Sequence, residues 1–144
     1  MLGRIHDLLL EALPVSGAAL VLVQDARATG VLARAGRGAD HAEELERRTG
    51  EGPCIEAVRA NEPVGEPDLA GEGIARWPRY GPLAAAAGLA SVAAFPVRVQ
   101  DRPIGALSIV SQWPTHLDPQ HERLAAGFAE LIGEVLRAGL LRER

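Results

Sequence analysis

The stretch "SVAAFPVRVQDRPIGALSIVSQW", residues 91–113, carries the clearest β pattern of the chain. Two runs rich in Val, Ile, Leu and Phe flank the polar triplet 100–102, which is typical of two antiparallel strands joined by a short turn. We therefore expect a long hairpin here. A shorter hairpin is expected from the β-compatible runs 17–23 and 30–36, which are separated by the more polar "QDARAT".

Helical patterns surround the two hairpins. Apolar residues recur at helical spacing near the N-terminus, and Asp118 followed by Pro119 is a typical helix start near the C-terminus. The charged segment 39–48 is expected to be a short exposed helix or a loop. Further helices are expected over residues 1–13, over 53–60 with Gly52 as N-cap, within the run 82–90, where Gly88 ends the helix, and over 118–141.

Four prolines lie between Glu62 and Pro82, so "VGEPDL" is expected to form at most a short edge strand. The resulting order of elements is typical of an α+β domain, an antiparallel sheet with helices on both faces. The 144 residues, 47% of them hydrophobic, are enough for one core. We expect a single domain over 1–144.

Composition excludes several classes of function. The net charge is −4, and the basic residues are fifteen scattered arginines with no lysine, which argues against direct nucleic-acid binding. No apolar run approaches the ~20 residues of a membrane span, and a single cysteine fits a cytoplasmic protein. The four histidines lack metal-ligand spacing, so we expect no metal site, and the sequence leaves any cofactor unknown.

Two segments together resemble a known family: "GEGPCIEAVRANEPVGEPDL" and "RWPRYGPLAAAAGLASVAAFPVRVQDRPIGALSIV". They are similar to the GAF sensor domains of actinobacterial regulators in which an RNA-binding ANTAR domain commonly follows. The resemblance implies a GAF (profilin/PAS-like) fold with five or six antiparallel strands. It places the first and last helices on one face and a small-molecule pocket on the other. The ANTAR domain is absent from this sequence, so output is expected to pass through a partner or a domain outside it.

Cys54 allows three interpretations. It is the second residue of an expected helix, where the helix dipole lowers the pKa of a thiol, so it could be a redox-active group. The glycines before it could form an anion cradle, but the spacing and the lysine of a phosphate loop are missing. The third interpretation, which we favour, is a small core residue behind a tight turn.

The GAF resemblance also suggests residues for the pocket and for a dimer interface. Aromatic side chains could stack on a planar ligand or fill the core, and Asp68 and Arg98 could add polar contacts or remain in solvent. The candidate ligand-binding residues are Cys54, Asp68, Trp77, Tyr80, Phe95 and Arg98. The terminal helices are expected to pair in a homodimer through Leu2, Leu9, Leu13, Leu131, Val135, Leu136 and Leu140.

The function expected from these features is regulatory. We expect a non-enzymatic GAF sensor in signal transduction or transcription control that binds an unidentified small molecule and acts through an output domain or a regulatory protein. Two alternatives stay open. One is a ligand-free dimerisation scaffold, and the other is a Cys54-dependent redox protein of the methionine sulfoxide reductase type, for which a single thiol leaves no internal resolving cysteine.

Overall fold

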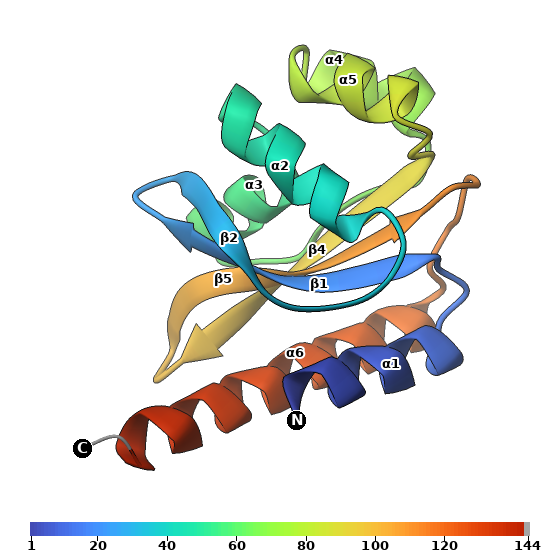
Figure 1. Ribbon diagram of the computed structural model, residues 1–144. Helices are drawn as coiled ribbons and strands as arrows, with labels where there is room; N and C mark the ends of the chain where they lie inside the picture. The colour runs from blue at the N-terminus through green and yellow to red at the C-terminus, as the bar shows by residue number, and fades with distance from the viewer. Residues whose placement is uncertain (143–144) are drawn as a thin grey trace.

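The computed structural model describes the backbone of residues 1–142 and the side chains of residues 1–139. A five-stranded antiparallel sheet in the order β2-β1-β5-β4-β3 forms its centre (Figure 1). The strands are β1 (Gly17–Gln24), β2 (Arg27–Gly36), β3 (Val64–Glu66), β4 (Ser91–Val99) and β5 (Arg102–Ser111). Both expected hairpins and the short edge strand are confirmed.

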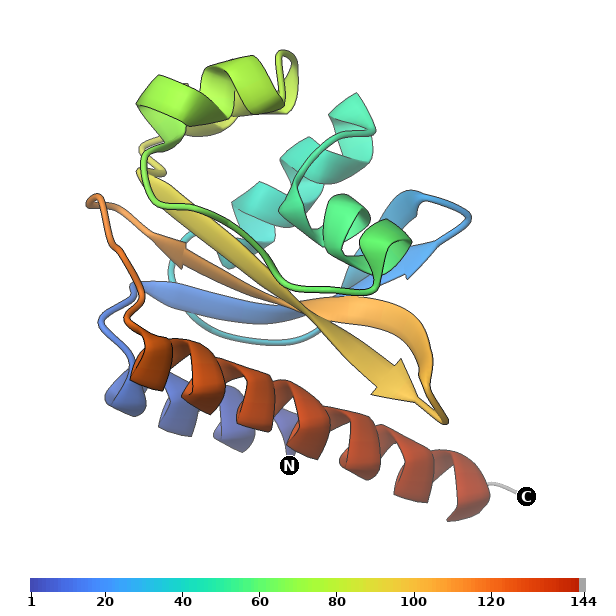
Figure 2. The same ribbon diagram turned by 180° about the vertical axis from the view of Figure 1, so that it is seen from behind.

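Helices cover both faces of the sheet, as Figures 1 and 2 show from opposite sides. One face carries α1 (Leu2–Ala12) and α6 (Pro119–Arg142), and the other carries α2 (Ala39–Thr49), α3 (Pro53–Ala60), the π-helical turn η1 (Leu69–Gly73), α4 (Ile74–Arg76) and α5 (Tyr80–Ala86). The expected α+β arrangement is therefore confirmed. Among the described helices, none has the length and hydrophobicity that crossing a bilayer requires.

The two hairpin turns are tighter than their sequences indicate. The turn residues Asp25 and Ala26 have φ angles of 53° and 62°, and Gln100 and Asp101 have φ angles of 52° and 66°. Two successive positive φ angles match the right-handed twist of the flanking strands. As a result β2 begins at Arg27, within the segment expected to be a turn.

The side chains of β4 alternate between two cores. Val92 and Ala94 belong to the core under α2, α3 and α5, whereas Phe95 and Val97 belong to the core under α1 and α6. Successive strand residues point to opposite faces of a sheet. Phe95 therefore lies on the opposite face from Trp77 and Tyr80, and the expectation that these three rings line one pocket is wrong.

The charged segment 39–48 forms the expected helix, but one side of that helix is buried, which corrects the expectation of a wholly exposed one. Helix α2 buries Ala39, Ala42, Glu43, Leu45, Glu46 and Thr49. Its alanines allow close packing on the sheet. Burial of Glu46 is tolerated because backbone N–H groups donate hydrogen bonds to its carboxylate.

The terminal helices use much of their apolar surface inside the chain. Leu9 and Leu13 are 0% and 4% exposed and pack in the core between the sheet, α1 and α6. Their assignment to a dimer interface is therefore wrong, since one sheet face already buries them. Leu2, Val135 and Leu136 are partly buried against the same core. Leu140 lies outside the residues whose side chains are described.

Helix α6 turns its smaller side chains toward the sheet. Ala125, Ala129 and Ile132 are buried, while Leu124 and Leu131 are 40% and 47% exposed. Leu124 and Leu131 therefore lie on the outer side of the helix. Close contact between α6 and β4 favours small residues at their interface. The exposed leucines of α6 therefore do not pack in this core.

Candidate functional site

A buried carboxyl group caps α3. The side chain of Glu46 accepts hydrogen bonds from the backbone N–H groups of Cys54 (3.2 Å) and Ile55 (3.1 Å). These are among the amides that a helix leaves free at its N-terminus, where the helix dipole also favours negative charge. Gly52 has a φ of 140°, and a Cβ there would overlap the Glu46 side chain. The turn before Cys54 thus needs glycine because Glu46 fills the space above it.

The environment of Glu46 sets its protonation. Burial raises the pKa of this carboxyl group to about 7, against the opposing effect of the hydrogen bonds from Ile55 and Cys54. Glu43 lies one turn earlier on the same side of α2, and burial raises its pKa as well. The interior therefore contains two carboxyl groups that bind protons more readily than exposed ones.

Cys54 is enclosed in the same interior. Its side chain is 0% exposed. Burial, followed by the charge of Glu46, raises the pKa of the thiol well above its usual value. A nucleophilic cysteine needs the opposite shift and some access to solvent. The geometry therefore supports the interpretation of Cys54 as a core residue.

Tyr80 and Trp77 form an aromatic pair beside this cysteine. Their rings meet edge to face with centroids 5.7 Å apart, and both side chains are buried. The Tyr80 hydroxyl is buried without a hydrogen-bond partner, and burial, followed by the charge of Glu46, raises its pKa. We call Glu43, Glu46, Cys54 and Tyr80 the interior cluster.

Residues 69–86, comprising η1, α4 and α5, contribute Tyr80 to the interior cluster and cover the rest of it, and we call them the cover segment. Two glutamates from the "GEGPCIE" motif hold it in place. Glu51 Oε1 accepts hydrogen bonds from the backbone N–H groups of Arg79 (2.7 Å) and Tyr80 (2.9 Å) at the start of α5. Glu56 accepts one from Trp77 Nε1 at 3.2 Å and pairs with Arg76, whose guanidinium lies 5.0 Å from the Trp77 ring centroid.

The remaining candidate residues lie elsewhere. Asp68 is exposed and accepts a hydrogen bond from the Gly71 N–H group within the turn η1. Arg98 is exposed and donates to the side chain and backbone oxygens of Asn61, at 2.6 and 2.8 Å, just beyond α3. Of the six candidates, the structure brings together Cys54, Trp77 and Tyr80 and separates them from Asp68, Phe95 and Arg98.

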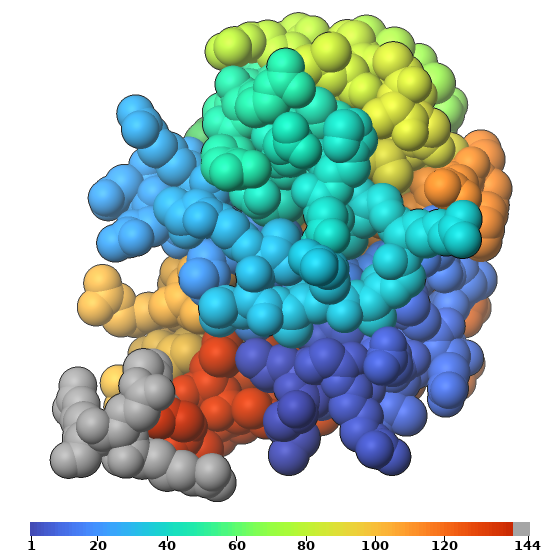
Figure 3. All heavy atoms as spheres, in the orientation of Figure 1, coloured from blue at the N-terminus to red at the C-terminus, as the bar shows by residue number. Residues whose placement is uncertain are grey.

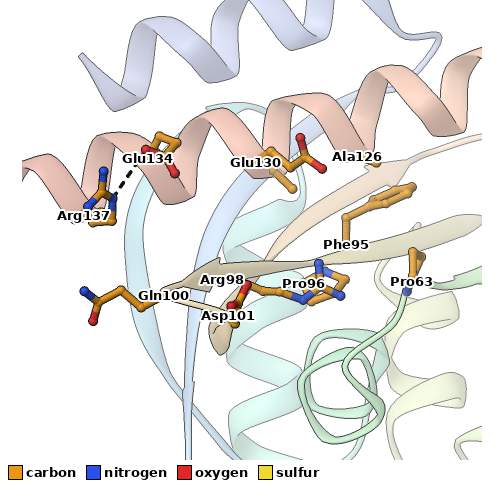
Figure 4. A pocket seen from close by; sticks show the side chains of 11 residues that line it. Pro63, Phe95, Pro96, Arg98, Gln100, Asp101, Ala126, Glu130, Glu134 and Arg137 are labelled. Carbon is orange, nitrogen blue, oxygen red and sulfur yellow. Dashed lines mark ion pairs between the residues drawn. The ribbon is translucent and has the colours of Figure 1, made fainter.

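Phe95 and Arg98 line a different hollow, shown in Figure 4. This groove of about 560 Å³ lies between α6 and the end of the β4–β5 hairpin. Its walls carry charges of both signs, and Glu134 and Arg137 pair across one turn of α6. The space-filling view in Figure 3 shows the opposite side of the molecule, where α2 and the cover segment form a closed surface.

The glutamates at 43, 46, 51 and 56 were missed by sequence reasoning. One signal could have indicated them: the helix at Pro53 starts behind Gly52, which has no side chain to cap it. Free amides at a buried helix start need an acceptor from elsewhere, and a nearby glutamate is a suitable one. In the described part of the chain, no group of three or more His, Cys, Asp or Glu side chains could hold a metal ion.

A five-stranded antiparallel sheet with two helices on one face and further helices over a polar interior on the other defines a class of α+β domain. The family model for the GAF domain matches residues 1–137. The chain therefore belongs to the GAF domain family, whose members are generally sensory or regulatory. No curated protein matches it significantly.

Solved structures agree with this fold. A GAF domain from Synechocystis in a photoproduct state is similar with a TM-score of 0.77 and 12% identity, over 99% of this chain and 95% of that one. A type II free methionine-R-sulfoxide reductase from Thermoplasma acidophilum has a TM-score of 0.73 and 24% identity, with 94% and 89% covered. The GAF domain region of a protein from Geobacter sulfurreducens has a TM-score of 0.73 and 19% identity, with 94% and 90% covered.

Proposed function

We propose that this GAF domain is a non-enzymatic, small-molecule sensor in signal transduction or transcription control, of the kind found in actinobacterial GAF–ANTAR regulators. The observation that carries the proposal is the interior cluster, whose Tyr80 hydroxyl is buried without a hydrogen-bond partner. Buried polar groups of a purely structural interior normally have such a partner. A ligand that hydrogen-bonds to this hydroxyl would stabilise the bound form.

The cover segment supports a sensing role because polar contacts hold it at two places. The hydrogen bonds that Glu51 and Glu56 accept are partly exposed, so water can replace them more easily than it can disrupt the packing of the apolar core. Ligand entry would shift the cover segment, and α5 leads directly into β4. We propose that this shift passes through the sheet to α1 and α6, and from there to an output domain or a regulatory protein in the cytoplasm.

We further propose that the sensor is a homodimer through the outer side of its terminal helices. Leu8 on α1 and Met1 just before that helix are 50% and 86% exposed, and Leu124 and Leu131 on α6 are also exposed. Together with Phe128 the α6 leucines line an apolar groove of about 420 Å³. Exposed apolar surface of this kind often marks a protein interface.

The sensing proposal can be tested through the two tryptophans. Trp77, in the cover segment, is 3% exposed, whereas Trp113, just beyond the end of β5, is 49% exposed. In the variant Trp113→Phe, fluorescence reports on Trp77 alone. We expect members of a metabolite mixture both to raise the melting temperature and to change this fluorescence, and native mass spectrometry should then identify the added mass.

The alternative is the ligand-free scaffold, which is favoured by the side chains that already fill the interior. A scaffold would show an unliganded mass, no change in melting temperature and no change in Trp77 fluorescence with any metabolite. A thiol-dependent activity is supported only by likeness of fold to the Thermoplasma reductase. The buried, protonated state of Cys54 argues against it.

A further inference from the structure

The interior cluster contains acidic groups without a basic partner inside. The side chains of Glu43 and Glu46 are 5% and 0% exposed. The chain has no lysine, and every arginine whose side chain is described is exposed. Arg47, on the exposed side of α2, forms an ion pair with Glu43, its Nε 3.5 Å from Glu43 Oε2, whereas Glu46 has no ion pair among the described residues. Carboxylates in a protein interior are unfavourable unless charge or hydrogen bonds compensate them, so this interior is short of positive charge.

The Tyr80 hydroxyl is an independent sign of a missing group. Tyr80 is 0% exposed, and its Oη has no hydrogen-bond partner. The charge of Glu46 acts on this hydroxyl, which places the hydroxyl near that carboxyl group. From β5, Ser108 adds a buried hydroxyl next to Cys54. A buried polar group without a partner is costly, so a ligand atom that bonds to Tyr80 would be bound favourably.

We propose that the interior cluster binds a small organic cation with N–H donors, an amine or a guanidine. The inference rests on the proposed sensing function and names the class of its ligand. An ammonium group supplies three donors and one positive charge. An ionised carboxylate has about four acceptor positions, of which the backbone amides use two at Glu46. Glu43 Oε2 and Tyr80 Oη offer further acceptors, whereas an anion would be repelled by both carboxyl groups.

Entry of the cation requires the cover segment to move, because side chains fill the interior in the unliganded structure. Glu51 and Glu56 hold that segment from outside the cluster, so the bonds that break on opening are not the bonds that hold the ligand. Trp77 belongs to the cover segment and contacts Tyr80. Its fluorescence therefore reports on occupancy of the cluster.

The test compares three probes of similar size and different charge on the Trp113→Phe protein at pH 8. The probes are n-butylammonium chloride, n-butanol and sodium butyrate, with ionic strength matched by sodium chloride. We expect only n-butylammonium to raise the melting temperature and change Trp77 fluorescence in a saturable way. Its effect should weaken at pH 5.5, where protons compete for the same carboxyl groups.

Variants test the residues. Glu43→Gln and Tyr80→Phe should each weaken n-butylammonium binding by about tenfold, the loss expected for one hydrogen bond to a charged group. Glu44→Gln is the matched control, because Glu44 is the exposed neighbour on the same helix, and it should bind like the parent protein. Equal binding by Glu43→Gln and Glu44→Gln would overturn the proposal.

Other outcomes separate this inference from the sensing function. If butanol or butyrate binds instead of the amine, or if none of the probes binds while a metabolite of another class does, the cationic class is wrong and the sensor stands. If neither the probes nor any metabolite binds and the melting temperature changes only with pH, the carboxyl groups of the interior cluster bind only protons. Both proposals would then be overturned.

Discussion

Glu46 combines three roles in one side chain. It caps α3 through two backbone amides, it makes glycine necessary at position 52, and it places an ionisable group in the interior. A serine or threonine cap would have satisfied one amide without any charge. The choice of an acid therefore makes the stability of this region depend on pH.

The first prediction concerns that dependence. The pKa of Glu46 is about 7 in the folded protein, above the ordinary value of 4.5, so the folded state keeps a proton that the unfolded chain releases. Its contribution to stability is full below pH 4.5, falls as the pH rises to about 7, and is then constant. The loss corresponds to about 3 kcal/mol. Urea midpoints between pH 4.5 and 8 measure it.

Comparison with a variant isolates Glu46 from other groups. Burial lowers the pKa of His6, so His6 destabilises the fold as the pH falls and acts in the opposite direction. Glu46→Gln should remove the larger part of the loss between pH 4.5 and 7, and it should keep the loss in the same direction from Glu43 and the opposite effect of His6. Glu44→Gln should retain the wild-type profile. An unchanged profile in Glu46→Gln would show that this carboxyl group does not titrate near neutrality.

At the scale of elements, the cover segment depends on polar anchors more than on its own sequence. Helix α5 begins at Tyr80 without a side-chain cap of its own, and Glu51 supplies the cap from the turn between α2 and α3. Gly81 lets α5 approach the backbone of Gly73, because a Cβ there would overlap the Gly73 carbonyl. The cover segment is thus tied to the same motif that carries Cys54.

The second prediction follows from this anchor. Glu51→Gln keeps the shape of the side chain but weakens two charge-assisted bonds, so the start of α5 should lose about 1–2 kcal/mol of local stability. Hydrogen exchange at the Arg79 and Tyr80 amides should become about tenfold faster. Glu62→Gln, on the exposed segment after α3, is the control and should leave these rates unchanged. Equal rates in both variants would contradict the capping role.

At the scale of the whole molecule, the sheet separates two cores of different character. The core under α1 and α6 is mostly apolar, with His6 among its few buried polar residues, and the core under α2, α3 and α5 contains the interior cluster. The outer side of α1 and α6 carries exposed leucines. Sensing and association are therefore assigned to opposite faces, and the sheet connects them (Figure 2).

The third prediction tests association. Leu131→Glu places a charge on the exposed apolar side of α6 and should convert a dimer to a monomer, as measured by light scattering after size-exclusion chromatography. Because Leu131 is 47% exposed, the melting temperature of the monomeric unit should change little. Leu32→Glu on β2, where the leucine is 53% exposed, is the control and should remain dimeric. A monomeric parent protein would remove the proposed interface.

Much of the fold could be predicted from local patterns. Alternating β-compatible residues predicted both hairpins, and Asp118 with Pro119 predicted the start of α6, where the Asp118 carboxylate accepts a hydrogen bond from the His121 N–H group at 2.7 Å. Such signals depend on neighbours in the chain. The charged segment 39–48 was misjudged because its burial depends on what Glu46 meets nine residues later.

The sequence by itself determined the order of elements, their antiparallel hairpins and the family, because these follow from short-range periodicity, turns and motifs. Only the tertiary structure decided which residues share a space. It placed Phe95 and Trp77 on opposite faces of the sheet, turned Leu9 inward and left Leu131 outside, and enclosed Glu46 with Tyr80. The physical reason is that burial and pairing depend on long-range contacts, and a carboxyl group is stable inside only where distant amides meet it.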